Sequence, residues 1–187
     1  MSSHATQETE IKLSVASLPA LRRTLRAAGF RVFHRRVFES NTIFDTAVPS
    51  LRPGGTLLRL RQAGPVVTLT YKGVASAAKH KSREELEVQV ADHAGMCAVL
   101  GRLGYQPTFR YEKYRTEFRE PVGEGIAMLD ETPIGVYMEL EGTPEWIDRA
   151  AHALGFCEAD YITASYGRLY QQWCEAHATD PTHMTFA

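Results

Sequence analysis

The chain of 187 residues has few cysteines and lacks the short motifs of the commonest nucleotide-binding and esterase enzymes. Its three cysteines, Cys97, Cys157 and Cys174, lie far apart, are odd in number and form no CxxC pair. This pattern argues against a disulfide framework or a zinc knuckle and for free thiols in a reducing cytoplasm. There is no HExxH, no glycine-rich Walker loop and no GxSxG, so the functions that those motifs indicate are excluded.

Two further absences concern membranes and nucleic acids. No apolar run is long enough for a signal peptide or a membrane span, so we expect a cytoplasmic protein that does not contact a membrane. Lys and Arg number 21 and Asp and Glu number 22, which gives a net charge of −1 at pH 7. Without a basic excess, binding of duplex nucleic acid has little electrostatic support.

The composition is that of an ordinary globular domain, with 44% hydrophobic and 23% charged residues. No internal repeat and no low-complexity linker divides the chain. We therefore predict a single domain over residues 1–187, with its core at about 8–177 and a frayed tail at 179–187.

Apolar and polar residues alternate in about eight segments, which predicts strands, and recur at helical spacing in three or four others. The strands follow one another in hairpins, which favours an antiparallel sheet and an α+β fold over a doubly wound sheet. Ser17 and Asp92 are the expected N-caps of the first two helices. The predicted strands begin near residue 8 and continue at 30–46, 57–61, 66–73, 83–90, 109–118, 126–131 and 135–141, and the predicted helices lie at 18–28, 92–103, 144–154 and 165–176.

Six of the predicted strands have one aliphatic face and one face that carries both signs of charge. The helices need an apolar partner, and the aliphatic faces provide one. The charged faces could then meet solvent on a flat sheet, or line the lumen of a barrel whose helices pack outside. Like charges about 4 Å apart repel by roughly 4 kcal/mol at an effective dielectric near 20, so a charged lumen suggests a bound metal and polyphosphate. The residues alone leave both architectures open.

The first strand carries Glu8, Glu10 and Lys12 at every second position, so these three side chains share one face. Adjacent carboxylates repel each other unless a cation lies between them, and oxygen ligands favour a hard ion such as Mg²⁺ or Mn²⁺. The lysine would suit the anion that such a metal carries. A solvated strand edge is the alternative, since charged strand faces are common.

The order of the charged motifs resembles that of the CYTH domain, the triphosphate tunnel metalloenzyme family, which includes class IV adenylate cyclases and thiamine triphosphatases. Glu8-x-Glu10-x-Lys12 is similar to the family signature, and later blocks follow in the family's order as far as about residue 170. These blocks are Leu58-Arg59-Leu60-Arg61, Thr70-Tyr71-Lys72-Gly73, Arg83-x-Glu85-x-Glu87, Glu112-Lys113-Tyr114-Arg115, Asp130, Gly135, Glu139-x-Glu141 and Ser165-Tyr166. The resemblance implies an eight-stranded antiparallel β-barrel that forms a triphosphate tunnel, with a charged lumen and helices packed outside.

The resemblance also implies a role for each charged group. The implied ligands of two divalent ions, Mg²⁺ or Mn²⁺, are Glu8, Glu10, Glu139 and Glu141, with Glu85, Glu87 or Asp130 as further candidates. The implied phosphate-binding residues are Lys12, Arg59, Arg61, Lys72, Arg83, Lys113 and Arg115. Lys12, Lys72 and Asp130 are the implied catalytic residues, with orientation of a basic neighbour as the alternative for Asp130. For Arg83 and Glu87, a salt bridge at the rim is the alternative.

The activity expected from this resemblance is metal-dependent hydrolysis of a triphosphate, either tripolyphosphate or a nucleoside or organic triphosphate such as ATP. The alternatives are a class IV adenylate cyclase, which makes cyclic AMP and pyrophosphate, and a non-catalytic polyphosphate-binding module. Ile43 stands where thiamine triphosphatases carry a tyrosine, which weighs against thiamine triphosphate. Thr163-Ala164 stands where some family hydrolases carry a lysine, which weighs against a mechanism with that lysine as base. A homodimer and a lid at residues 74–81 are left open.

Overall fold

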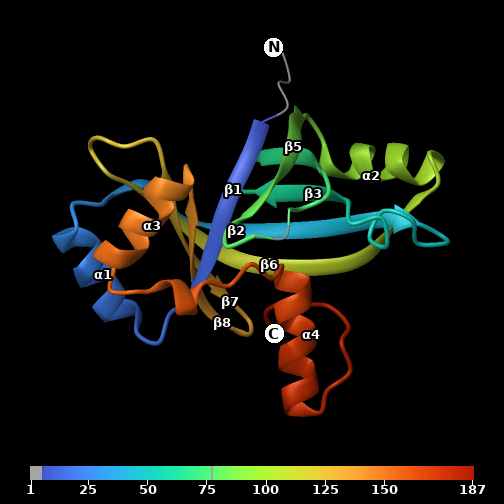
Figure 1. Cartoon of the computed structure of the whole chain (residues 1–187). Coiled ribbons are helices and arrows are strands. Elements are labelled where there is room, and N and C mark those ends of the chain that lie inside the picture. Colours follow the sequence, from blue (N-terminus) through green and yellow to red (C-terminus); the bar gives the residue numbers. More distant parts are fainter. Residues whose placement is uncertain (1–5, 77) are drawn as a thin grey trace.

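The computed structural model describes residues 6–76 and 78–187, and these residues form a closed barrel of eight antiparallel strands with four α-helices outside it (Figure 1). The order around the barrel is β1-β5-β4-β3-β2-β6-β7-β8. The strands are β1 (Thr6–Ser14), β2 (Arg31–Thr46), β3 (Leu57–Ala63), β4 (Val66–Lys72), β5 (Lys81–Val90), β6 (Tyr105–Arg119), β7 (Ile126–Thr132) and β8 (Gly135–Glu141). The helices are α1 (Leu18–Ala27), α2 (His93–Arg102), α3 (Pro144–Ala153) and α4 (Tyr166–His177), with a short 3₁₀ helix η1 (Glu158–Asp160) before α4. The predicted α+β barrel is confirmed.

Strand β1 closes the barrel because its two halves pair with different neighbours. Its N-terminal half pairs with β5 as far as Glu10↔Lys81, and its C-terminal half pairs with β8 from Glu10↔Glu141 onward. Glu10 therefore lies at the fork where β5 and β8 diverge. The long strands β2 and β6 pair along most of their length, as Figure 1 shows, and β6 begins at Tyr105 rather than at 109 because β2 continues to pair as far as Thr46.

The hydrophobic core lies outside the barrel, between its aliphatic outer face and the helices. On one side, α1 contributes Leu21 and Leu25 and α3 contributes Trp146 and Ile147 to a single buried cluster. Helix α2 lies on the other side of the barrel in Figure 1, and its Leu100 packs in a second cluster with side chains of β2, β3 and β4. Burial of apolar surface against the outer face stabilises this arrangement, and the alternative of a flat sheet with a solvated charged face is wrong.

The helix ends follow the sequence signals. Ser17 accepts a hydrogen bond from the backbone N–H of Ala20, and Asp92 accepts from those of Ala94 and Gly95, so both predicted N-caps are confirmed. These caps satisfy N–H groups that have no partner inside the helix. Among the helices of the described residues, none is both long and apolar enough to cross a membrane. The segment 74–81, for which a lid was left open, includes residue 77, which lies outside the described residues.

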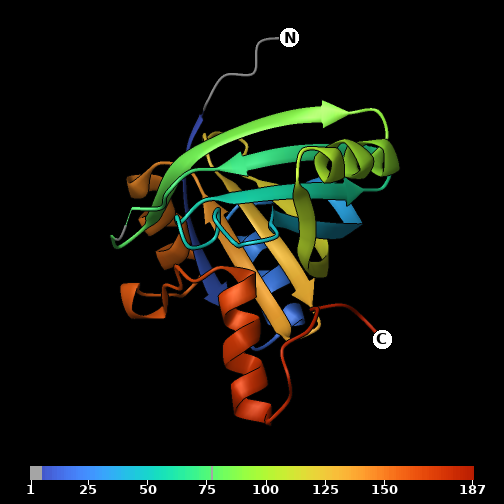
Figure 2. The same cartoon turned by 90° about the vertical axis from the view of Figure 1, so that its right-hand side faces the viewer.

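The C-terminal segment is packed, and the prediction of a frayed tail at 179–187 is wrong. After α4 the chain turns back toward the barrel (Figure 2), and Met184 forms a parallel bridge with Tyr111 of β6. The backbone N–H of Glu112 donates to the Met184 carbonyl at 2.9 Å. The Met184 side chain is fully buried in a cluster with Tyr111 and Tyr170, and this apolar burial holds the tail in place.

Candidate active site

The barrel encloses a cavity of about 500 Å³, which we call the lumen. Successive side chains of a strand point to opposite faces, so every second residue of these strands points inward. All predicted phosphate-binding residues, and all predicted metal ligands except Asp130, line the lumen: Glu8, Glu10, Lys12, Arg59, Arg61, Lys72, Arg83, Glu85, Glu87, Lys113, Arg115, Glu139 and Glu141. Their roles stay predictions, but the sequence pattern placed them on the correct face.

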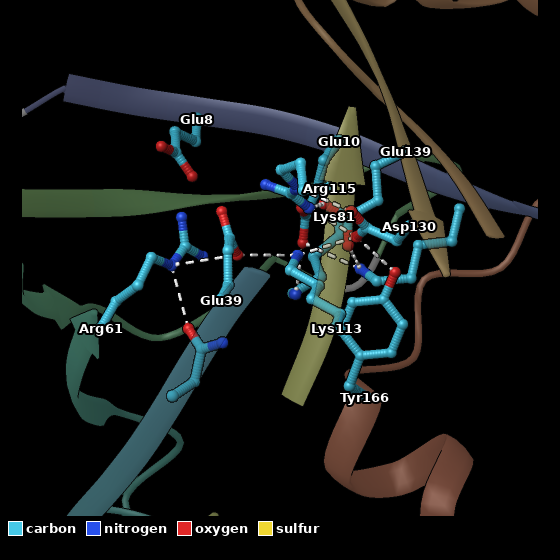
Figure 3. A network of polar contacts seen from close by, with 12 residues as sticks. Glu8, Glu10, Glu39, Arg61, Lys81, Lys113, Arg115, Asp130, Glu139 and Tyr166 are labelled. Carbon is cyan, nitrogen blue, oxygen red and sulfur yellow. Dashed lines mark hydrogen bonds and ion pairs between the residues drawn. The ribbon is translucent and has the colours of Figure 1, made fainter. Parts of the chain in front are cut away.

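Asp130 is the one predicted site residue that does not line the lumen among the described residues. It is fully buried in β7, where it pairs with Lys113 Nζ at 2.8 Å and with Arg115 Nε and Nη2 at 2.7 and 2.6 Å. The hydroxyl of Tyr166, at the start of α4, donates to the same carboxylate at 2.7 Å (Figure 3). Burial and the nearby Asp130 carboxylate raise the pKa of Tyr166, so the phenol stays a donor. This geometry favours an orienting role for Asp130, which fixes two cations whose other faces line the lumen.

A second set of contacts lies where β1 meets β5 and β8. Lys12 Nζ lies 3.3 Å from Glu139 Oε1 and 3.5 Å from Glu10 Oε1, and Lys81 Nζ donates to the same Glu10 oxygen at 2.7 Å. Arg115 also bonds to Glu139 (Figure 3). Burial alone would lower the pKa of Lys12, but the carboxylates of Glu10 and Glu139 outweigh it and raise that pKa. The lysine therefore stays charged at neutral pH.

The wall formed by β3, β4 and β5 is basic, with acids that compensate it only in part. Arg59 Nη2 donates to Thr70 at 3.1 Å and to Glu87 at 3.2 Å, while Lys72 pairs with Glu85. Arg59 Nε is buried and has no hydrogen-bond partner among the described residues. A buried unpaired donor is costly, so this guanidinium is suited to an anion in the lumen.

Arg83 and Glu8 border the same wall. Arg83 Nε lies 3.4 Å from Glu85 Oε1, and Glu8 Oε2 lies 3.5 Å from Lys72 Nζ. In Figure 3, Glu8 stands apart from the contacts around Asp130. Both cations contact Oε1 of Glu85, and its Oε2 is buried without a hydrogen-bond partner among the described residues.

Several residues of the network were not assigned roles from the sequence: Glu39, Asn41, Lys81, Tyr111 and Tyr166. Glu39 is buried, with its Oε2 3.4 Å from Arg61 Nε and 3.6 Å from Lys113 Nζ. Burial would raise the pKa of Glu39, but these two cations outweigh it and lower the pKa to about 2. Asn41 accepts from Arg61 Nε at 2.9 Å. The signal that was available is the spacing of two along β2 and β6, which puts Glu39 and Asn41 on one face and Tyr111 in phase with Lys113.

Glu141 differs from the other carboxylates because it has no ion pair or hydrogen bond with any described residue. Burial, together with the carboxylates of Glu8, Glu10 and Glu139, raises its pKa to about 7. In the described part of the chain, no three acidic, histidine or cysteine side chains already converge as a metal site. Glu10 and Glu139 are instead bonded to cationic side chains. An uncompensated carboxylate among three others nevertheless fits a hard divalent cation in its donor type and in its charge.

Comparison with known proteins shows the family of the chain and solved structures with a similar fold. A curated protein of Methanocaldococcus jannaschii, named a putative adenylate cyclase, is 27% identical over 135 residues, which cover 72% of this chain and 75% of that protein. The structure of a putative adenylate cyclase from Vibrio parahaemolyticus has a TM-score of 0.76 at 22% identity and covers 90% of this chain and 99% of its own. A Hippeastrum structure, described as a putative adenylyl cyclase with a dominant triphosphatase activity, has a TM-score of 0.68 at 19% identity, with coverages of 88% and 95%. The family model described as CYTH domain matches residues 6–166, and the chain therefore belongs to the CYTH domain family.

Proposed function

We propose that this protein is a divalent-metal-dependent triphosphatase that hydrolyses tripolyphosphate or an organic triphosphate in its lumen. CYTH proteins are enzymes that act on triphosphate-bearing substrates. The observation that carries the proposal is the imbalance inside one cavity. One wall holds a buried guanidinium donor without an acceptor, on Arg59, and another holds a carboxylate without a cation, on Glu141. A metal–triphosphate complex supplies both missing partners.

The phosphate chain would lie against the cationic walls. Lys113 and Arg115 are already fixed by Asp130, so binding costs little ordering of these two side chains. Arg59 offers its free Nε, and a guanidinium can bind phosphate oxygens through two parallel hydrogen bonds. Lys12 is held between Glu10 and Glu139, which brings positive charge to the wall that carries the carboxylates.

The carboxylates of Glu8, Glu10, Glu139 and Glu141 would hold Mg²⁺ or Mn²⁺. When bound there, such an ion neutralises phosphate charge and lowers the pKa of a water molecule. Glu85 and Glu87 are not among the carboxylates that surround Glu141. They belong to the basic wall, where they pair with Lys72 and Arg59, so we place them second as ligands.

The reaction requires a water oxygen to attack the terminal phosphorus while the bond from that phosphorus to the bridging oxygen breaks. Negative charge spreads over the terminal phosphoryl oxygens and the departing diphosphate. Lys12 and Arg115 both contact Glu139. Their positive charges therefore lie beside the carboxylates that would hold the metal. Preorganised cations stabilise such developing charge without reorganisation at the moment of reaction.

A class IV adenylate cyclase is the second candidate, and two observations favour it. The relatives from Methanocaldococcus jannaschii and Vibrio parahaemolyticus are named putative adenylate cyclases. The lumen is also lined by the aromatic rings of Phe109 and Tyr170, whose centroids lie 5.9 Å apart. Such rings can stack on a nucleobase. The Hippeastrum protein, described by a dominant triphosphatase activity despite its cyclase name, supports placing hydrolysis first.

The deciding experiment is one reaction panel with purified protein and Mg²⁺ or Mn²⁺. Tripolyphosphate, ATP and thiamine triphosphate are supplied separately, and phosphate, pyrophosphate and cyclic AMP are resolved. Orthophosphate release, fastest from tripolyphosphate or another triphosphate, supports the triphosphatase. Cyclic AMP with an equal amount of pyrophosphate replaces it with the cyclase. Tight triphosphate binding without turnover leaves a binding module and overturns both enzymes.

A further inference from the structure

A group of side chains outside the barrel, which we call the clasp, joins the segment before β5 to α3 and to η1. The clasp consists of Lys79, His80, Asp148, Glu158 and Tyr161. Asp148 Oδ1 lies 2.8 Å from His80 Nε2 and accepts a hydrogen bond from the Tyr161 hydroxyl at 3.0 Å. Lys79 Nζ lies 3.1 Å from Asp148 Oδ2 and 2.8 Å from Glu158 Oε2. Asp148 is therefore the shared centre of the clasp.

Lys81 directly follows His80 of the clasp, and its side chain lines the lumen. It is the first residue of β5, and its pairing with Glu10 is the last between β5 and β1 before β1 joins β8. Its ammonium group is buried and donates to Glu10 at 2.7 Å. The β1–β5 ladder therefore ends at Lys81, and the clasp contacts are what hold His80 beside it.

The segment after η1 also reaches a second lumen lysine. Ile162 follows Tyr161, and its backbone exchanges two hydrogen bonds with that of Lys12, at 2.8 and 2.9 Å. Lys12 and Lys81 both contact the same oxygen of Glu10. The clasp thus joins the two chain segments that present lysines to one carboxylate of the lumen.

We propose that Lys81 is a further triphosphate-binding residue and that Asp148 is its positioning residue, acting from outside the barrel through the clasp. This inference rests on the proposed triphosphate site. Lys81 lines the lumen and contacts the same Glu10 oxygen as Lys12. When the ligand enters, the Lys81 ammonium can leave Glu10 and bind a phosphate oxygen instead. Asp148 does not line the lumen, and 39% of its side chain is exposed. Its removal therefore takes no charge out of the lumen, and any effect on binding must pass through position.

A double-mutant cycle separates positioning from general destabilisation. The dissociation constant for tripolyphosphate is measured by calorimetry in EDTA, so that metal-dependent turnover does not consume the ligand. We expect Lys81→Met to weaken binding by about 10-fold and Asp148→Ala by about 5-fold. In the Lys81→Met background, Asp148→Ala should weaken binding less than about 2-fold, because the lysine that it positions is absent. In turnover assays, Asp148→Ala should raise KM and leave kcat within about 2-fold.

Glu145→Ala is the matched control, since Glu145 is an exposed acid one turn earlier on the same helix and lies outside the clasp. It should leave binding unchanged. His80→Ala removes a different member of the clasp and repeats the test if Asp148→Ala folds poorly. Equal weakening by Asp148→Ala in both backgrounds, or none in either, overturns the inference. Wild-type protein that binds tripolyphosphate without hydrolysing it overturns the triphosphatase alone, whereas wild-type protein that binds no triphosphate overturns both.

Discussion

Asp130 and Glu141 are both buried or half-buried carboxylates of this barrel, on neighbouring strands β7 and β8, yet their surroundings are opposite. Asp130 is fully buried and bonds to Lys113, Arg115 and Tyr166. Glu141 has other carboxylates as neighbours and no bonded partner among the residues that the structure describes, and its pKa is raised to about 7. One carboxylate is satisfied by the protein itself, whereas the other requires something that the chain does not supply.

This contrast separates what holds the lumen in shape from what is available to a ligand. A buried ion pair adds little to the free energy of unfolding compared with apolar residues of similar volume. Removal of one partner is nevertheless destabilising, because it leaves the other charge buried and unpaired. Asp130 is therefore expected to matter first for stability. Burial and neighbouring carboxylates disfavour the charged form of Glu141 in the absence of a cation, so it is expected to matter for function and not for folding.

Asp130→Ala should give the largest effect, because it leaves Lys113 and Arg115 in the lumen wall without their shared carboxylate. We expect a loss of about 3–5 kcal/mol in the free energy of unfolding. Triphosphate turnover should fall with it, because both cations lose their orientation. Urea denaturation followed by circular dichroism measures the stability. Asp180→Ala, an exposed acid in the C-terminal segment, is the control, and a loss below about 1 kcal/mol for Asp130→Ala would contradict the structural role.

Glu141→Gln tests the other side of the comparison. The amide keeps the shape of the side chain and removes a carboxylate that has no ion pair or hydrogen bond with a described residue, so stability should stay the same or rise. Turnover should fall about 100-fold or more, as for loss of a preorganised electrostatic group. The wild-type protein should gain about 2.7 kcal/mol of stability at a Mg²⁺ concentration 100 times the dissociation constant.

That stabilisation by Mg²⁺ should shrink in Glu141→Gln, which gives a readout that does not depend on activity. Thermal unfolding with and without Mg²⁺ measures it. Glu175→Gln, an exposed acid on α4, should retain the full effect of the metal. Unchanged turnover together with unchanged stabilisation in Glu141→Gln would remove Glu141 from the metal site.

The contrast between these carboxylates was only partly accessible from the sequence. The alternation along each strand predicted that Lys113 and Arg115 share one face of β6 and that Glu139 and Glu141 share one face of β8, because that period is a property of a single strand. Which side chains then meet across the barrel depends on strand order and register. The resemblance to the CYTH family supplied the barrel and the alternative that Asp130 orients a basic neighbour. Neither source predicted that Asp130 bonds to two cations while Glu141 bonds to none.

Other residues were missed for equally local reasons. The pairing of β2 with β6 shifts register at three places, including Ile43/Phe44, so a strict alternation does not run through β2. Glu39 and Asn41 lie between two of these shifts, where the spacing of two is regular, so the pattern indicated a shared face but no role. The tail was predicted to fray because its one buried anchor, Met184, lies among polar residues and gives no periodic signal. The fold was therefore more predictable than the contacts, which depend on distant segments.

Arg59→Met extends the comparison from acids to bases, because Arg115 is saturated by Asp130 and Glu139 whereas Arg59 has a free Nε. Its partner Glu87 has 48% of its side chain exposed, so loss of the guanidinium leaves no acid buried there. We expect KM for triphosphate to rise roughly 10–30-fold with a smaller change in kcat, as for loss of a charged hydrogen bond. Arg22→Met on α1, at an exposed position, should change neither value. A normal KM in Arg59→Met would remove this residue from the phosphate site.

Tyr166→Phe makes the finest change to the satisfied side, because it removes one hydrogen bond to Asp130 and keeps both cations in place. Asp130 would still bond to Lys113 and Arg115, so we expect a loss of about 1 kcal/mol in unfolding free energy and little change in turnover. Tyr137→Phe is the control, since the two rings pack 5.7 Å apart and the Tyr137 hydroxyl bonds to no described residue. A loss in Tyr166→Phe as large as that in Asp130→Ala would mean that the phenol, and not the ion pairs, holds Asp130 in position. Urea denaturation of Tyr166→Phe and Tyr137→Phe, compared with that of Asp130→Ala, decides between these outcomes. Of the two tyrosine variants, only Tyr166→Phe loses a hydrogen bond to Asp130.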